Sequence, residues 1–274
     1  MKKLLLAALT ASLSLSVFGY DIFSYVSING NAKSYTQTEY SVSTKFGDYF
    51  RTPVGKTTHT LNEAAKDVEV TEYTPRDVLV NKTQISFDAS GKETGLVCVN
   101  ADGETEYKEV YSYKNGQKSD VSSYGKDGSL EGKIIYAYEA GLMTEETAYD
   151  GDGVLIWKNV YKYEESKLSK KCRYFADGTL QEEENYKYSN TGAIESITTN
   201  STSWGTKQEV FRYASNGQLS EIITYDDENK VCDRLVIKYD AQGNVAKVSD
   251  YSVAEKFGTT VNELGYLAEF TYTY

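Results

Sequence analysis

Apolar and polar residues alternate along much of the chain. In one such stretch, Trp157, Tyr161 and Tyr163 share one face of an extended strand, and Lys158 and Lys162 share the other. A period of two is typical of an antiparallel β-sheet whose two faces have different surroundings. The alternation therefore predicts a sheet with one aromatic face and one charged face that carries a thin aliphatic stripe.

The alternating stretches recur every 25 residues. One strand of each successive unit ends at a tyrosine: Tyr113, Tyr138, Tyr163, Tyr188, Tyr213 and, one residue late, Tyr239. Two residues before each of these stand Tyr111, Tyr136, Tyr161, Tyr186, Phe211 and Ile237. Gly-containing turns follow five of these six pairs, and a second series of Asp-Gly turns falls half a period later, at Gly103, Gly128, Gly153 and Gly178. Because such turns favour tight hairpins, each unit is predicted to be one β-hairpin.

We therefore predict an all-β protein, built as a long antiparallel meander of β-hairpin repeats that forms an extended or curled single sheet. No significant helix is expected after the N-terminal leader. The regular array spans residues 76–250, with N-terminal edge units in residues 20–75 and a closing unit in residues 251–274. Residues 40–47 and 251–258 share the sequences Tyr-Ser-Val and Lys-Phe-Gly. Either the two segments are related units that close the ends of the array, or the match is a coincidence.

Two stretches of the array resemble the YD-repeat (RHS-type) family: Phe211-Arg212-Tyr213-Ala214-Ser215-Asn216-Gly217-Gln218-Leu219 and Ile237-Lys238-Tyr239-Asp240-Ala241-Gln242-Gly243-Asn244-Val245. A third, Tyr174-Phe175-Ala176-Asp177-Gly178-Thr179-Leu180, is similar to MORN-type hairpin repeats. The first resemblance covers residues 76–250 and implies a long β-sheet spiral used as a scaffold or shell in exported proteins. The unit here is longer than is typical of that family, and the chain is too short for an encapsulating shell. The family's delivery role is therefore not expected.

Residues 1–19 have the features of a secretory signal peptide. Lys2 and Lys3 precede an apolar stretch that ends at Phe18, and Gly19 fits a cleavage site before Tyr20. The stretch is short and rich in serine for a membrane anchor. The sequence thus predicts an exported chain, which is periplasmic, on the cell surface or secreted, with no transmembrane segment in the mature form.

The predicted mature chain is acidic. Loss of Lys2 and Lys3 changes the formal net charge from −11 to −13. Such a surface repels phosphate backbones, so nucleic acid is not an expected partner. Cys98, Cys172 and Cys232 have no metal-type spacing, and three semi-buried free thiols are expected.

Enzymatic motifs are nearly absent from the sequence. His59 is the only histidine and lies in a predicted strand. The Ser-x-x-Lys pattern from Ser123 to Lys126 falls in a repeat turn and lacks companion motifs. The acidic stretches that begin at Asp150 and Asp226 resemble calcium loops but fit hairpin turns better, because calcium needs more oxygen ligands. The sequence therefore predicts a protein without a catalytic residue, a cofactor or a metal site, and we do not expect it to be an enzyme.

The aromatic face suggests two roles. Its rings could pack against one another or against a second layer, or they could stack on a polysaccharide or anchor a protein. The candidate binding residues are Tyr111, Tyr136, Tyr161, Tyr186, Trp157 and Trp204. We expect a non-catalytic binding or scaffold protein of the cell envelope or surface whose partner is an envelope protein or a polysaccharide. The alternative is a polysaccharide-binding protein that uses the tyrosine-rich face, and a hydrolase is a weaker possibility.

Overall fold

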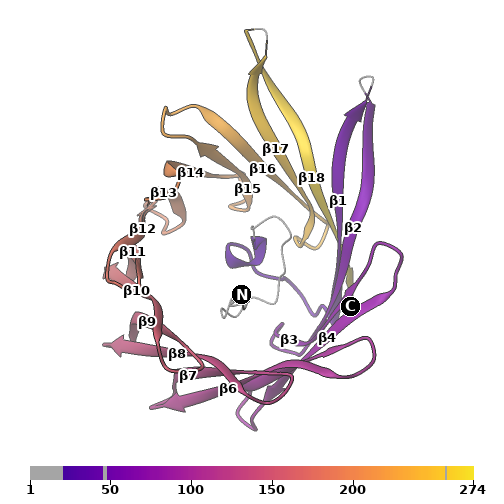
Figure 1. Ribbon diagram of the computed structural model, residues 1–274. Helices are drawn as coiled ribbons and strands as arrows, with labels where there is room; N and C mark the ends of the chain where they lie inside the picture. Colours follow the sequence, from indigo (N-terminus) through magenta and orange to yellow (C-terminus); the bar gives the residue numbers. More distant parts are fainter. Residues whose placement is uncertain (1–20, 46–47, 257) are drawn as a thin grey trace.

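The protein is a single closed β-barrel. The computed structural model describes residues 21–45, 48–256 and 258–274, so the predicted signal peptide lies outside the described residues. Each of the 18 strands pairs antiparallel with its neighbours in the sequence, and β1 also pairs with β18 (Figure 1). The strands are β1 (Ser34–Lys45), β2 (Asp48–Leu61), β3 (Asp67–Tyr73), β4 (Leu79–Phe87), β5 (Glu93–Asn100), β6 (Thr105–Lys114), β7 (Gln117–Gly125), β8 (Leu130–Glu139), β9 (Leu142–Asp150), β10 (Leu155–Glu164), β11 (Lys167–Phe175), β12 (Leu180–Tyr188), β13 (Ile194–Ser201), β14 (Gly205–Tyr213), β15 (Leu219–Tyr225), β16 (Val231–Tyr239), β17 (Val245–Lys256) and β18 (Thr259–Thr273).

The predicted all-β meander of hairpins is confirmed, but the prediction of an open or merely curled sheet is wrong. The strand order closes through the pairing of Ser34 to Ser41 with Thr273 to Tyr266. Closure has two physical causes. It covers the apolar face of the sheet, and it removes the open edges along which a sheet would pair with other chains. The only helix in the described part of the chain is the 3-10 turn η1 (Ile22–Ser24).

Closure also overturns the resemblance to the YD-repeat family, because the sheet forms a ring and not a spiral. The shared pattern of Tyr and Gly has a local cause. The tyrosines that end the strands donate their hydroxyl groups to a backbone carbonyl of the preceding hairpin, as Tyr163 does to Met143 (2.8 Å), Tyr188 to Leu168 (2.9 Å) and Tyr239 to Leu219 (2.7 Å). The 25-residue spacing thus reflects a bond between neighbouring hairpins that any array of such hairpins can form.

The N-terminal segment, residues 21–33, lies inside the ring of strands (Figure 1). Ile22, Phe23 and Tyr25 pack against the inner face of β14–β18, where Phe211 and Phe270 belong to the same apolar cluster. An 18-stranded barrel is too wide for its own side chains to fill, so this segment supplies the second layer of the core. We refer to it as the plug.

The plug is fixed at one end of the barrel by a pair of asparagines. The backbone N–H of Asn29 donates to Oδ1 of Asn244 at 2.6 Å, and Nδ2 of Asn244 donates to the carbonyl of Asn29 at 3.0 Å. Asn244 is 1% exposed, and its backbone N–H donates to Asp240 Oδ1 in the β16–β17 turn. The reciprocal bonds hold the plug against a rigid turn.

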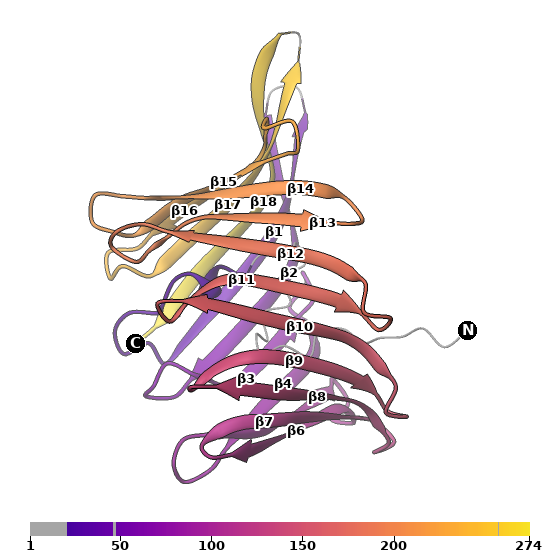
Figure 2. The ribbon, with the colours of Figure 1, turned by 90° about the vertical axis from the view of Figure 1, so that its left-hand side faces the viewer.

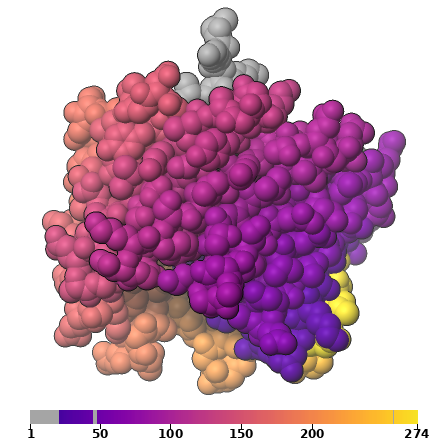
Figure 3. All heavy atoms as spheres, turned by 90° about the horizontal axis from the view of Figure 1, so that it is seen from below, coloured from indigo at the N-terminus to yellow at the C-terminus, as the bar shows by residue number. Residues whose placement is uncertain are grey.

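The outer wall of the barrel is charged. Neighbouring strands are linked there by ion pairs, among them Lys82–Glu69, Lys133–Asp120, Lys158–Glu145, Lys170–Glu183 and Arg234–Glu221. Figure 2 shows the adjoining hairpins of the wall, and Figure 3 shows their atoms as one continuous surface. The predicted aromatic face is the inner one, but charged side chains such as Glu184 and Lys171 lie on it as well.

Candidate functional site

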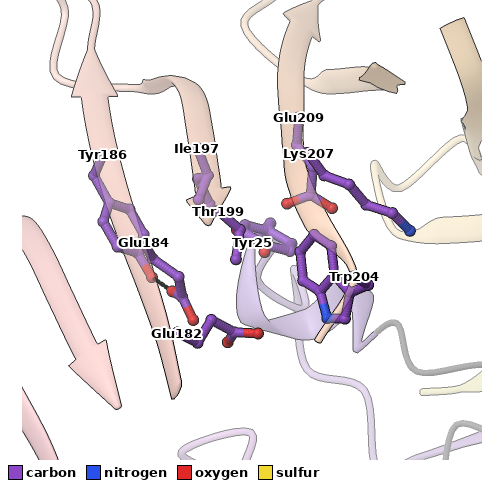
Figure 4. Close-up of a pocket in the computed structure, with 9 residues that line it drawn as sticks. All are labelled: Tyr25, Glu182, Glu184, Tyr186, Ile197, Thr199, Trp204, Lys207 and Glu209. Carbon is purple, nitrogen blue, oxygen red and sulfur yellow. Dashed lines mark hydrogen bonds between the residues drawn. The ribbon is translucent and has the colours of Figure 1, made fainter. Parts of the chain in front are cut away.

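A cavity of about 410 Å³ lies on the inner wall between the plug and strands β12–β14 (Figure 4). The residues that line it are Tyr25, Glu182, Glu184, Tyr186, Ile197, Thr199, Trp204, Lys207 and Glu209. Its volume is within the range of about 300–1,000 Å³ that is usual for small-ligand sites. The cavity combines aromatic rings, carboxylates, a hydroxyl group and one ammonium group.

Alternation along the strands brings these side chains to one surface. On β12, Glu182, Glu184 and Tyr186 are two residues apart and so face the barrel interior together. Glu184 is opposite Thr199 on β13, and Thr199 is opposite Lys207 on β14. Trp204 lies in the β13–β14 turn and is 46% exposed, so its ring forms the rim of the cavity.

Glu184 is the cavity carboxylate whose hydrogen bonds define its position. Glu184 accepts a short hydrogen bond from the Tyr186 hydroxyl and pairs with Lys171 Nζ at 2.7 Å. Burial raises the pKa of Tyr186, as do the nearby Glu184 carboxylate and its hydrogen bond, so this phenol remains a proton donor at neutral pH. Lys207 Nζ lies 5.3 Å from the centre of the Trp204 ring. The cavity can therefore accept hydrogen bonds from a polar ligand and offer an aromatic face to it.

The structure brings two of the six candidate binding residues, Tyr186 and Trp204, into the cavity. Trp157 also faces the interior, where the Arg173 guanidinium carbon lies 4.4 Å from the centre of its ring. Tyr111, Tyr136 and Tyr161 line the interior over β6–β10. Tyr111 belongs to a second apolar cluster with Leu96 and Val121, and Tyr136 packs against that cluster. The predicted face is thus one continuous inner wall, and only its β12–β14 portion borders the cavity.

Buried carboxylates follow the inner wall beyond the cavity. Glu109 accepts a hydrogen bond from the Tyr111 hydroxyl at 2.9 Å, and Glu146 accepts one from Asn159 Nδ2 at 2.9 Å. Burial raises the pKa of Glu109, and it does the same for Glu39 and Glu72. Burial thus favours the protonated form of these three carboxyl groups.

His59 is a core residue of the barrel wall. It is 1% exposed, its ring stacks on Tyr35 at a centroid distance of 4.2 Å, and its Nδ1 lies 3.0 Å from Asp67 Oδ2.

In the two acidic turns that resemble calcium loops, the first carboxylate accepts hydrogen bonds from backbone N–H groups. Asp150 Oδ1 accepts the N–H groups of Asp152 and Val154, and Asp226 Oδ1 accepts those of Glu228 and Lys230. Within the described ranges, no group of three or more His, Cys, Asp or Glu side chains could hold a metal ion.

The three cysteines are free, as expected from the sequence. Cys98 and Cys172 are buried, and Cys232 is partly buried. None of the helical residues that the structure describes forms a span long and apolar enough to cross a membrane.

The sequence analysis missed two features of the wall. Glu182, Glu184 and Glu209 were not distinguished from solvated carboxylates, although each lies two residues before another inward position of the repeat. A second tyrosine series, Tyr124, Tyr149 and Tyr174, also recurs every 25 residues. These tyrosines pair with Leu130, Leu155 and Leu180. The pairs face outward beside the Asp-Gly turns, so the same spacing marks an outer apolar band at one end of the barrel.

Comparisons with known proteins find distant structural similarity. No family model and no curated protein matches the chain. A porin-like protein from Bacteroides uniformis is 11% identical with a TM-score of 0.48, and the match covers 90% of this chain and 99% of that one. A porin-like protein from Bacteroides vulgatus is 10% identical with a TM-score of 0.26, and covers 77% and 98%. A DUF1329 family protein from Desulfovibrio piger is 10% identical with a TM-score of 0.27, and covers 88% and 84%. The strand pairings themselves establish the barrel.

Proposed function

We propose that the protein is an exported, non-catalytic binding protein of the cell envelope that holds an amine-bearing oligosaccharide inside its barrel. The observation that carries the proposal is the cavity, where Trp204 and Tyr186 lie beside Glu182, Glu184 and Glu209. Aromatic rings offer large, rigid contact surfaces, and carboxylates accept hydrogen bonds from hydroxyl and ammonium groups.

The charge of the cavity favours a cationic ligand. Three carboxylates line it against a single lysine, and Lys171, outside the lining, pairs with Glu184. The inner wall already holds cations on aromatic rings, since Lys118 Nζ lies 3.9 Å from the centre of the Tyr111 ring. A ligand ammonium group would find the same combination of ring face and carboxylate in the cavity. An anionic sugar would be repelled.

The outer wall supports an aqueous location within the envelope. Membrane-spanning barrels present an apolar band about 25 Å tall to the lipid, and a Lys or Arg at the middle of that band costs about 2–4 kcal/mol. Here Lys133, Lys158 and Lys170 lie on outward positions of the wall, paired with carboxylates. We therefore propose that the barrel wall faces water, with export directed by residues 1–19. Fractionation of the producing cell tests this directly, because the protein should be released without detergent.

Calorimetric titration of residues 20–274 with glucosamine oligosaccharides tests the ligand. We expect binding, and we expect Trp204→Ala to weaken it by about 30-fold, the loss typical of removing a central aromatic contact. Trp157→Phe is the matched control, because Trp157 faces the interior outside the cavity, and it should bind as the parent does. N-acetylated oligosaccharides of equal length should bind less tightly. Equal binding of both would remove the amine preference, and binding of neither would refute the function.

A further inference from the structure

Two hairpins extend away from the ring of strands, on either side of the place where the barrel closes (Figures 1 and 2). The pairing of β1 with β18 runs from Ser34↔Thr273 to Ser41↔Tyr266 and then stops. Both strands continue beyond this point. Residues 42–45 of β1 pair only with β2, and residues 259–264 of β18 pair only with β17. We refer to these two facing edges, residues 42–45 and 259–265, as the open seam.

The open seam is a sheet edge within the described chain that no strand covers. An exposed edge offers a row of unpaired N–H and C=O groups that an extended polypeptide can complete. Two-stranded ribbons are also only marginally stable in water without further support. Both hairpins therefore gain from an additional strand.

The residues along the two sides of the β1–β2 ribbon differ in how they tolerate such a strand. On the side away from the seam, β2 carries Pro53, which is exposed and cannot donate a backbone hydrogen bond. On the seam side, β1 and β18 contain no proline, and Val42, Thr44, Thr259, Thr260 and Val261 favour extended backbone. The outer edges of the ribbons, residues 48–52 of β2 and 253–256 of β17, are also unpaired, but only the seam offers two edges that face each other.

The shared sequences also point to the hairpins. Residues 40–45 and 251–256 are both first strands of the extended hairpins, and both begin with Tyr-Ser-Val. Elsewhere the repeat has no such segment, so the two matching sequences occur where the barrel wall ends and the ribbons begin. Residues 40–45 of β1 border the seam, whereas residues 251–256 of β17 pair with β18 on their seam side, so the match marks the two ribbons and not the seam itself.

We propose that the open seam binds an extended segment of another polypeptide, which pairs antiparallel with residues 259–265 in the place that β1 leaves. This inference is independent of the sugar-binding function. A foreign segment is favoured over a second copy because two copies, each with a formal charge of −13 after loss of Lys2 and Lys3, repel each other. For the same reason a neutral or basic segment fits better than an acidic one.

Hydrogen exchange of residues 20–274, with and without a probe peptide, tests the proposal. The probe is a peptide of residues 38–45, Thr-Glu-Tyr-Ser-Val-Ser-Thr-Lys, whose sequence already pairs with β18 in its first half. We expect fast exchange at residues 259–265 in the free protein and slowing by an order of magnitude at saturating peptide. The control peptide carries Val42→Pro and Thr44→Pro and should have no effect.

Three outcomes would overturn the proposal. Protection of residues 259–265 in the dilute free protein would show that the seam is closed in solution. Protection that rises with protein concentration, together with a dimer in sedimentation, would show that a second copy occupies it. An unchanged exchange rate with saturating probe would show that the edge does not accept a strand.

Discussion

The two halves of the barrel interior differ in the chemistry of their inward side chains. In the half formed by β14–β18, the inner column reads Phe211 and Ile237, and the plug covers it with Ile22 and Tyr25. In the half formed by β6–β12, the same column consists of tyrosines, and Tyr111 and Tyr186 bond to inward carboxylates. In this column the hydroxyl group is absent at Phe211 and Ile237, whereas Tyr186, which also packs against the plug cluster, keeps its hydroxyl on Glu184. The change from tyrosine to Phe or Ile thus falls within the part of the wall that the plug covers.

The largest expected effect on stability comes from a charge placed in the half of the interior that the plug covers. Ile22 is 5% exposed within the apolar cluster, so Ile22→Asp would bury a carboxylate without a partner. We expect the free energy of unfolding of residues 20–274 to fall by more than about 4 kcal/mol, as measured by urea titration. Val154→Asp is the control, because Val154 is 60% exposed, and a change within about 0.5 kcal/mol is expected. Equal effects of the two changes would show that the plug does not pack inside the barrel.

A hydroxyl group added to the covered half and one removed from the other half should change the stability less, and by different amounts. Phe211→Tyr adds an atom to the packed cluster beside the Tyr25 ring, whose centre lies 5.1 Å away, and overpacking a buried site costs about 1–3 kcal/mol. Tyr136→Phe removes a hydroxyl from a half-buried ring and should cost less than about 1 kcal/mol. Thermal unfolding of the two variants measures the difference. A larger loss for Tyr136→Phe would mean that the uncovered half depends on its hydroxyl groups as much as on its rings.

The smallest expected effect is on the pH dependence of the free energy of unfolding. Because burial raises the pKa of Glu109 in the folded protein, ionisation of this carboxyl opposes folding, and its contribution to stability falls as pH rises through that raised pKa. Glu109→Gln should therefore remove part of the decline, with a gain on the order of 1 kcal/mol near pH 7 and little change at pH 4. Urea titrations across this range provide the test.

Asp127 supplies the opposite case for the same measurement. Hydrogen bonds from Ser129 lower the pKa of the exposed Asp127 carboxyl, so its contribution is present at neutral pH and is lost as pH falls through that lowered pKa. Asp127→Asn should thus alter the acid side of the profile and leave the neutral side unchanged in slope. If Glu109→Gln and Asp127→Asn shifted the profile in the same direction, the assignment of Glu109 to a buried site would be wrong.

The local fold could be predicted from the sequence because its causes are local. Alternation at Trp157, Tyr161 and Tyr163 fixes the strands, and the Asp-Gly turns fix the hairpins. Closure could not be predicted, because it depends on whether β1 meets β18, and their contact joins residues more than 200 positions apart, such as Tyr35 and Tyr272. An open meander and a ring have the same local sequence.

The candidate site was predicted only in part for a similar reason. Tyr186 and Trp204 were among the candidate binding residues. Their carboxylate neighbours were not, although Glu184 and Glu209 lie two residues before Tyr186 and Phe211 and therefore share their face of the strand. Tyr25 belongs to a segment before the array, and nothing in its sequence shows that it enters the barrel.

The seam lies outside the repeat array, and this has a consequence for how such a barrel can change size. Neighbouring hairpins of the array bond to one another through tyrosine hydroxyls such as that of Tyr188, while β1 and β18 close the ring. Tandem duplication of one 25-residue unit would insert two strands and a new hydroxyl bond without altering the closing strands. Because barrel diameter grows with strand number, gene duplication could enlarge the enclosed space one hairpin at a time, with the same two ends sealing every version.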